Sequence, residues 1–180
     1  MNVVAESSAF LPARADWDAI LVEVNAWRGC CLHHFSTVEL AVTETLLALS
    51  AASTGVGNIR LRQLIGQRLD DLSVAIGPEG PFSNVGKGAY PRLCQFREHQ
   101  EAFRVLLCHG AIKVTVDLHA RWTLVIRSLS IRAGQPQRGL VVIEQAEARS
   151  KLAALSRDGQ RLTTALDQLR RNLPDRQPSS

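Results

Sequence analysis

Apolar residues recur at intervals of three and four along four stretches of the chain, a pattern that predicts amphipathic helices. The expected helices cover residues 16–27, 36–50, 60–76 and 90–109. The second begins at Ser36-Thr37-Val38-Glu39, a sequence typical of a capping box at a helix N-terminus. The stretch 77–91 is rich in glycine and proline, so we expect a loop there.

The periodicity changes after Gly110, which we expect to end the fourth helix. Apolar and polar residues then alternate over 112–116 and 122–131, which predicts two short strands joined near His119 and Ala120, with a third at 140–143. A last helix is expected from 146 to 172. Its seam is Leu152, Leu155, Gly159, Leu162, Leu166, Leu169 and Leu173, which we expect to pack inside the molecule, with Gly159 allowing close helix approach.

These elements predict a mostly α fold: a bundle of about five helices with a small β-hairpin or three-strand insertion before the last helix. A chain of 180 residues, 46% hydrophobic and 21% charged, is typical of one compact domain. We place that domain at residues 16–172. A loose arm is expected over 1–15 and a disordered tail over 173–180.

Composition favours a cytoplasmic protein that is not bound to a membrane. No apolar run approaches the ~20 residues that span a bilayer, and the N-terminus lacks the basic start of a signal peptide. The four cysteines have no disulfide-like spacing, which indicates reduced thiols. A net charge of +4 is compatible with an anionic partner but does not require one.

The main candidate site is Arg104 and His109, at the end of the expected helix 90–109. An arginine can hold a phosphate, and an imidazole can move protons near neutral pH. On one ideal helix the two lie about 140° and ~7.5 Å apart, so a frayed last turn, the long arginine stem or a second copy must bring them together. Arg97, two turns earlier, and Lys113, beyond the helix end, are candidates for guiding an RNA backbone.

The order of these elements resembles HEPN-domain proteins, a helical family with many metal-independent endoribonucleases. The resemblance rests on a helix with an early glutamate, Glu39, and a later helix that closes in Arg104, four residues, His109 and Gly110 before a hairpin and a terminal helix. It implies RNA cleavage by 2′-hydroxyl attack with Arg104 and His109 as catalytic residues and no cofactor. It also implies a homodimer with a composite site, and a toxin or antiphage role with an antitoxin or other regulatory partner.

Two alternatives stay open. In the first, the two residues have no catalytic role: Arg104 forms a surface ion pair and His109 stabilises the end of the helix. The same fold also serves as a non-catalytic module for dimerisation or for binding RNA or a partner. Val105 favours this second class, because the family usually carries a polar residue after the arginine. The sequence shows no helix-turn-helix pattern with a basic recognition helix, so it does not favour a DNA-binding regulator.

Other motifs are weaker. Cys30 and His34 lie four residues apart, but their surroundings match no standard zinc spacing, so we predict no metal site. The stretch from Gly80 to Gly88 has five residues between its first two motif glycines and lacks the Ser or Thr of a phosphate-binding loop. Cys108, beside His109, is expected to be a buried bystander.

Overall fold

The computed structural model describes residues 14–53, 59–132 and 134–173. The arm expected over 1–15 and the tail expected over 173–180 fall almost entirely outside these ranges. The described part contains five helices and three strands, so the predicted mostly α fold is confirmed. In chain order the elements are α1 (Arg14–Ala52), α2 (Ile65–Ile76), α3 (Ser83–Gly86), α4 (Tyr90–His109), β1 (Ala111–Val116), β2 (Trp122–Arg132), β3 (Gln135–Glu144) and α5 (Gln145–Arg171).

The first helix is one continuous element of 39 residues, so the prediction of two helices was wrong. No proline interrupts it, and the buried positions keep their spacing through the expected break. Ser36 is therefore not a helix cap, and the Thr37 hydroxyl donates to the His33 carbonyl at 3.0 Å inside the helix. The buried residues of α1 are Ile20, Val24, Trp27, Cys31, Phe35, Val38, Ala41, Val42, Thr45, Leu46 and Leu49.

Two further boundaries differ from the predictions. The helix expected from residue 60 begins at Ile65, and Leu61 and Leu64 before it are exposed. The stretch 77–91, expected to be a loop, contains the four-residue helix α3. Gly86 is the last residue of α3, and a Cβ there would stand 2.6 Å from Cβ of Ile76. Glycine is thus needed because α3 packs directly onto the end of α2.

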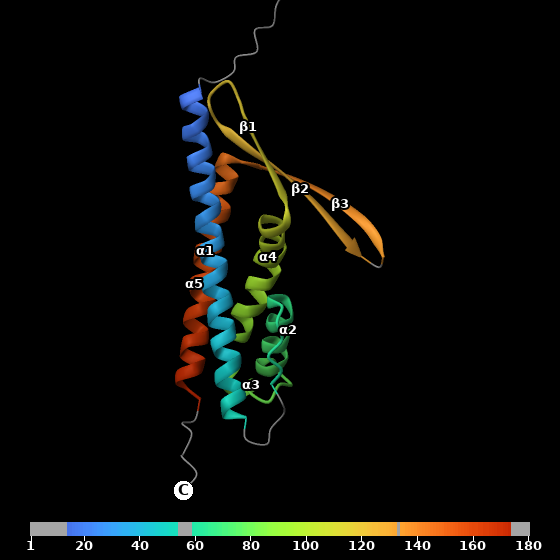
Figure 1. Cartoon of the computed structure of the whole chain (residues 1–180). Helices are drawn as coiled ribbons and strands as arrows, with labels where there is room; N and C mark the ends of the chain where they lie inside the picture. The colour runs from blue at the N-terminus through green and yellow to red at the C-terminus, as the bar shows by residue number, and fades with distance from the viewer. Residues whose placement is uncertain (1–13, 54–58, 133, 174–180) are drawn as a thin grey trace, which may run out of the picture.

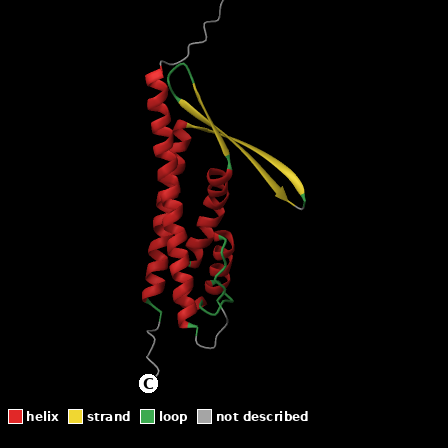
Figure 2. Cartoon of the chain, in the orientation of Figure 1, coloured by secondary structure: helices red, strands yellow, loops and turns green. Residues whose placement is uncertain are grey.

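The long helices form the body of the molecule, with the sheet at one end (Figures 1 and 2). Helices α1 and α5 run parallel: the Trp27 indole donates to the Ala148 carbonyl at 2.7 Å, and Val38 meets Gly159 further along. A Cβ on Gly159 would lie 3.3 Å from the Val38 side chain, which confirms the expected close approach. Helix α4 runs antiparallel to α1.

An aromatic cluster joins these helices to the sheet. Trp27 of α1 packs against Phe103 of α4 and Trp122 of β2, with ring centroids 6.2 and 6.1 Å apart. Phe35 contacts Phe96 and Phe103 at 6.5 and 6.1 Å. Such tilted and edge-on pairs are favourable ring geometries. The cluster fixes α4 against α1, and with it the residues near the end of α4.

The sheet is antiparallel in the order β1-β2-β3. The predicted hairpin and third strand are therefore confirmed, although β3 is longer than expected. One face, with Trp122, Leu124, Ile126 and Ile143, is buried against the helices. Beyond Arg127, β2 pairs only with β3, and this two-stranded part extends away from the bundle (Figure 1).

Gly110 ends α4 as predicted, but for a different reason. Its backbone is extended, with φ −80° and ψ 140°, so no left-handed conformation requires glycine. A Cβ at this position would instead stand 2.4 Å from the Ile126 side chain. The residue is small because β2 crosses directly over the end of the helix.

Candidate functional site

An open hollow of about 610 Å³ lies between α1, the start of α2 and α4. Arg97, Arg104 and His109 all line it, so the structure brings three of the four sequence-predicted site residues to one place. The other lining residues are Glu39, Gln63, Leu64, Ile65, Gly66, Gln67, Arg68, Asp70 and Glu101.

Arg104 forms an ion pair with Glu39 across the gap between α4 and α1. Its Nε donates to Oε1 of Glu39, and the two side chains are 20% and 30% exposed. A half-buried pair of this kind holds the guanidinium in a fixed orientation. Because Nε makes this bond, the two terminal Nη nitrogens lie outside it and can face a ligand.

Arg97 is held by two carboxylates. Its Nη2 lies 2.6 Å from Oδ1 of Asp70, and its Nε lies 3.2 Å from Oε2 of Glu101. Burial lowers the pKa of Arg97, but the hydrogen bonds to Glu101 and Asp70 outweigh that effect and raise the pKa above its ordinary value. The side chain therefore ties α4 to α2 while remaining 28% exposed.

Arg68 supplies a third guanidinium to the hollow. It donates to the Thr43 hydroxyl at 2.5 Å and to the Gln63 carbonyl at 3.1 Å, both neutral oxygens. The charged lining thus comprises three arginines and three carboxylates. Each carboxylate is paired with Arg97 or Arg104. His109 adds a titratable group to this balanced set.

His109 is the last residue of α4 and is exposed. Arg28 of α1 donates to the Leu107 carbonyl at 3.1 Å, which satisfies one of the free carbonyls in this last turn. The histidine therefore sits on a turn that is anchored to the bundle, with Gly110 and the sheet directly behind it.

Lys113 and Val105 do not belong to the hollow. Lys113 is exposed on β1, opposite Val125 and on the face of the sheet turned away from the helices. Val105 is 48% exposed on α4 and is not among the lining residues. An RNA path from the hollow to Lys113 would have to cross the end of α4.

Sequence reasoning did not select Glu39, Arg68, Asp70 or Glu101 as site residues. Glu39 carried a signal, because it is one of few charged residues in a long apolar stretch. The sequence pattern assigns Glu39 to a capping box and to the early part of a helix, and neither assignment makes it a site residue. Arg68 and Asp70 gave no local signal, since only the packing of α2 against α1 and α4 brings Arg68 to Thr43 and Asp70 to Arg97.

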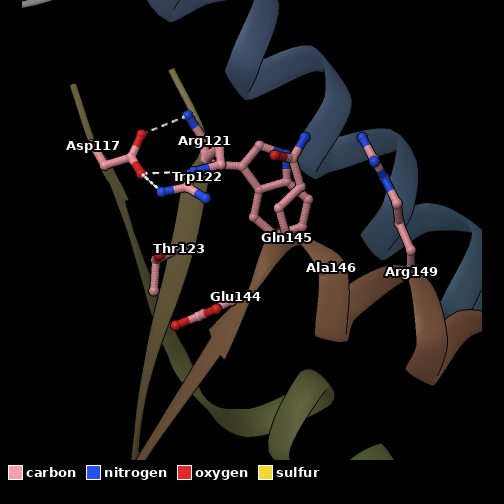
Figure 3. A pocket seen from close by; sticks show the side chains of 8 residues that line it. All are labelled: Asp117, Arg121, Trp122, Thr123, Glu144, Gln145, Ala146 and Arg149. Atoms are coloured by element: carbon pink, nitrogen blue, oxygen red, sulfur yellow. Dashed lines mark hydrogen bonds and ion pairs between the residues drawn. The ribbon is translucent and has the colours of Figure 1, made fainter. Parts of the chain in front are cut away.

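A second, smaller pocket of about 260 Å³ lies at the base of the sheet (Figure 3). Its polar groups are used within the protein: Asp117 accepts hydrogen bonds from the backbone and side chain of Arg121, and Arg149 pairs with Glu23 at 3.0 Å. A hydrogen bond from Gln145 is the main cause of the lowered pKa of Glu23. These contacts close the β1–β2 turn and link the start of α5 to α1.

The cysteines are free thiols. Cys31 is buried, whereas Cys30, Cys94 and Cys108 are exposed, so the expectation that Cys108 is buried was wrong. Helix α4 places Cys108 outside the α1–α4 contact that buries Leu107. Within the described ranges, no group of three or more His, Cys, Asp or Glu side chains is arranged to hold a metal ion.

Helix α1 is long and apolar enough to cross a membrane by length and composition alone, and the prediction that no stretch approaches this limit was too strict. In the structure, the helix packs lengthwise against α5 and contributes much of the core. Comparison with protein-family models, with characterised proteins and with solved structures gives no match to this chain.

Proposed function

We propose that this protein is a metal-independent endoribonuclease of the HEPN type, which cuts RNA by attack of a ribose 2′-hydroxyl on the adjacent phosphate. One observation carries the proposal: Arg104 and His109 line the same hollow, with Arg97 beside them. Residues five positions apart on an ideal helix point in different directions, so the sequence spacing alone did not place both side chains in one hollow.

In this proposal the Nη groups of Arg104 stabilise the negative charge that develops on the oxygens of the pentacoordinate phosphorus. Glu39 positions the guanidinium, so little reorganisation is needed when RNA binds. His109 acts as general base on the 2′-hydroxyl or as general acid on the leaving 5′-oxygen. The product ends are a 2′,3′-cyclic phosphate and a 5′-hydroxyl.

The proposed setting is the cytoplasm, where a homodimer restricts growth or phage under the control of an antitoxin or other regulatory partner. Three exposed free cysteines support a reducing compartment. The exposure of His109 at a helix end supports a site that a second copy or an RNA strand completes.

A second candidate function is a non-catalytic module that binds RNA or a partner. Arg97 and Arg104 both contact carboxylates of the same chain, which weakens the field that attracts a phosphate. Val105 also lies where the family usually has a polar residue. This candidate predicts RNA or partner binding without cleavage.

The test is incubation of the full chain with end-labelled RNA in excess EDTA. Wild type is expected to release 2′,3′-cyclic phosphate ends. His109→Ala should lower the cleavage rate by about 10²–10⁴-fold, the usual contribution of a general acid or base. Arg104→Ala should lower it by about 10²–10³-fold, as for loss of a group that stabilises transition-state charge.

Two matched controls come from the same chain. Arg92→Ala removes an exposed arginine from the first turns of α4, and His119→Ala removes an exposed histidine from the β1–β2 turn. Both should cleave like wild type. Cleavage that persists in both site variants would rule out the site, whereas RNA binding without cleavage by wild type would support the non-catalytic module.

A further inference from the structure

The β2–β3 hairpin extends beyond the start of β1 as a two-stranded arm (Figure 1). Trp122, Leu124 and Ile126 are buried and mark the side of β2 that faces the helices. Because side chains alternate along a strand, the odd-numbered residues of β2 and their partners on β3 lie on the opposite side. We define the outer face of the arm as the exposed members of this set between residues 127 and 142: Arg127, Leu129, Ile131, Pro136, Arg138, Leu140 and Val142.

The outer face of the arm is apolar and open to solvent. Leu129, Ile131, Leu140 and Val142 are 68%, 76%, 65% and 52% exposed. Beyond Val141, the other side of the arm carries small or polar residues: Ser128, Ser130, Gln135, Gln137 and Gly139. An antiparallel sheet with one solvated face normally turns its polar side to water. The arm leaves its apolar side uncovered, which indicates that another molecule covers it.

Strand β3 also has a free edge. The strand order β1-β2-β3 leaves one edge of β3 without a partner strand in the described part of the chain. The strand is ten residues long and is exposed except at Ile143. An edge strand presents unpaired backbone N–H and C=O groups that can pair with a strand of another chain. Pro136 and Arg138 limit such pairing near the tip, but the stretch 139–143 contains neither proline nor charge.

The cations of this surface have no carboxylate partner. Arg127, Arg138 and Lys113, which lies on the same side of the sheet in β1, are exposed and form no ion pair within the described ranges. Other arginines of the chain do form such pairs: Arg62, Arg97, Arg104, Arg121, Arg149, Arg157 and Arg170.

The arm itself is basic. From residue 127 to 143 the sequence contains three arginines and no acidic residue. Glu144 lies on the same side as the outer face, but at the base of the sheet, opposite Thr123. A partner that carries carboxylates would therefore complement the charge of the arm.

These features favour a protein segment over other occupants. Interfaces with nucleic acid are more polar than interfaces between proteins, whereas large apolar side chains dominate the outer face. Lipid would leave the backbone groups at the free edge of β3 without hydrogen-bond partners. A second copy of the arm would bring three further arginines, and no carboxylate, to the same surface.

We propose that the free edge of β3 binds an extended segment of a partner protein as a fourth, antiparallel strand. Apolar residues of this segment lie opposite Leu140 and Val142, and a carboxylate lies opposite Arg138. In such strand addition, main-chain hydrogen bonds provide affinity and alternate side chains provide specificity. The inference does not rest on the proposed ribonuclease activity, because the arm lies outside the hollow and binding, not cleavage, is measured.

The experiment measures the fluorescence anisotropy of a labelled nine-residue peptide mixed with the full chain. Odd positions of the peptide are threonine, and even positions are, in order, valine, valine, glutamate and glutamate. Wild type is expected to bind it about tenfold more tightly than a control peptide with lysine in place of both glutamates. Arg138→Glu should reverse this preference, because opposite charges on neighbouring strands attract and like charges repel.

Arg92→Glu is the matched control variant. It makes the same change of charge at an exposed position of α4 and should keep the preference of wild type. Both substituted residues are exposed, so both variants should keep the Tm of wild type.

Two N-methylated forms of the glutamate peptide test the strand pairing itself. Each form carries methyl groups on alternate backbone amides, so one lacks the N–H groups that face β3 and the other lacks those that face solvent. One form should lose binding and the other should bind like the unmodified peptide.

Three results would overturn the proposal: no binding of the glutamate peptide to wild type at 1 mM, equal binding of the glutamate and lysine peptides, or equal binding of the two N-methylated forms. An RNA duplex, or vesicles of phosphatidylcholine and phosphatidylglycerol, could bind wild type but not Arg138→Glu while the peptide does not bind. That result would overturn it in favour of nucleic acid or a membrane. A dimer that Arg138→Glu dissociates, without peptide binding, would overturn it in favour of a second copy.

Discussion

At the scale of single residues, the environment of each polar group decides what it can do. Glu39 and Arg104 lie 65 positions apart in the chain, yet they form an ion pair that holds the guanidinium at the edge of the hollow. His109 gains its position from the last turn of α4, which Arg28 anchors. Burial likewise distinguishes Cys31 from the three exposed cysteines.

Cys31 should be far less reactive than the exposed cysteines. Burial, with a smaller effect of the neighbouring Cys30, raises the pKa of the Cys31 thiol to about 12. Its thiolate fraction at pH 8 is then roughly two to three thousandfold lower than that of an ordinary thiol with a pKa near 8.5. Brief treatment with iodoacetamide at pH 8, followed by peptide mass spectrometry, should label Cys94 and Cys108 and spare Cys31.

The control is the same reaction in guanidinium chloride, where all four cysteines should be labelled. Labelling of Cys31 in the native protein at the rate of Cys94 would contradict both its burial and its raised pKa.

At the scale of elements, continuity and termination are set by neighbours. Helix α1 continues through Ser36 because its buried positions stay in phase on the same core. Helix α4 ends at Gly110 because β2 occupies the space that a side chain would need. The β1–β2 turn, in contrast, is stabilised locally by Asp117.

The β1–β2 turn should weaken in acid at an unusually low pH. Backbone and side-chain hydrogen bonds from Arg121 are the main causes that lower the pKa of Asp117 to about 2, and the His119 amide contributes a smaller effect. The folded pKa lies below the unfolded value of about 3.9. The stabilisation is therefore complete above about pH 4 and is lost as the pH falls towards 2.

An NMR titration that follows the His119 and Arg121 amides should show a midpoint near 2. Asp117→Asn should abolish this transition and leave the rest of the spectrum folded. A midpoint near 3.9 would mean that the turn does not hold the carboxylate.

At the scale of the whole molecule, the parallel contact of α1 and α5 organises the bundle. Trp27 at one end and Gly159 further along fix the two helices in register. Helix α4 then packs antiparallel on α1, which places Arg104 and His109 beside the start of α2.

Gly159→Leu should destabilise the fold by about 1–3 kcal/mol, the usual cost of adding volume to a packed interior. Even a Cβ at this position would lie 3.3 Å from Val38, and a leucine must push α5 away from α1. Urea unfolding followed by circular dichroism measures the change.

Ala153→Leu places the same side chain on the exposed face of α5 and should change stability by no more than about 0.5 kcal/mol. Equal effects of the two substitutions would mean that α1 and α5 are not closely packed at Gly159.

The sequence predicted the fold class and the order of most elements well, and the site in part. Periodicity found α4, β1, β2 and α5, because their apolar residues recur at the spacing of a helix or a strand, and it found only the apolar end of β3. It placed a false break before Ser36, since a capping-box sequence occurs inside helices as well as at their ends. It identified Arg104 and His109 as candidates but missed Arg68 and Asp70, which come from another helix.

The sequence by itself determined the mostly α fold, the position of the hairpin and the residue types available for chemistry, because these depend on local periodicity and composition. Only the tertiary structure decided that α1 is continuous, that Arg104, His109 and Arg97 share a hollow, and that Glu39 holds Arg104. It also decided which side of α1 is exposed. These features depend on contacts between residues distant in the chain, and local pattern does not encode such contacts.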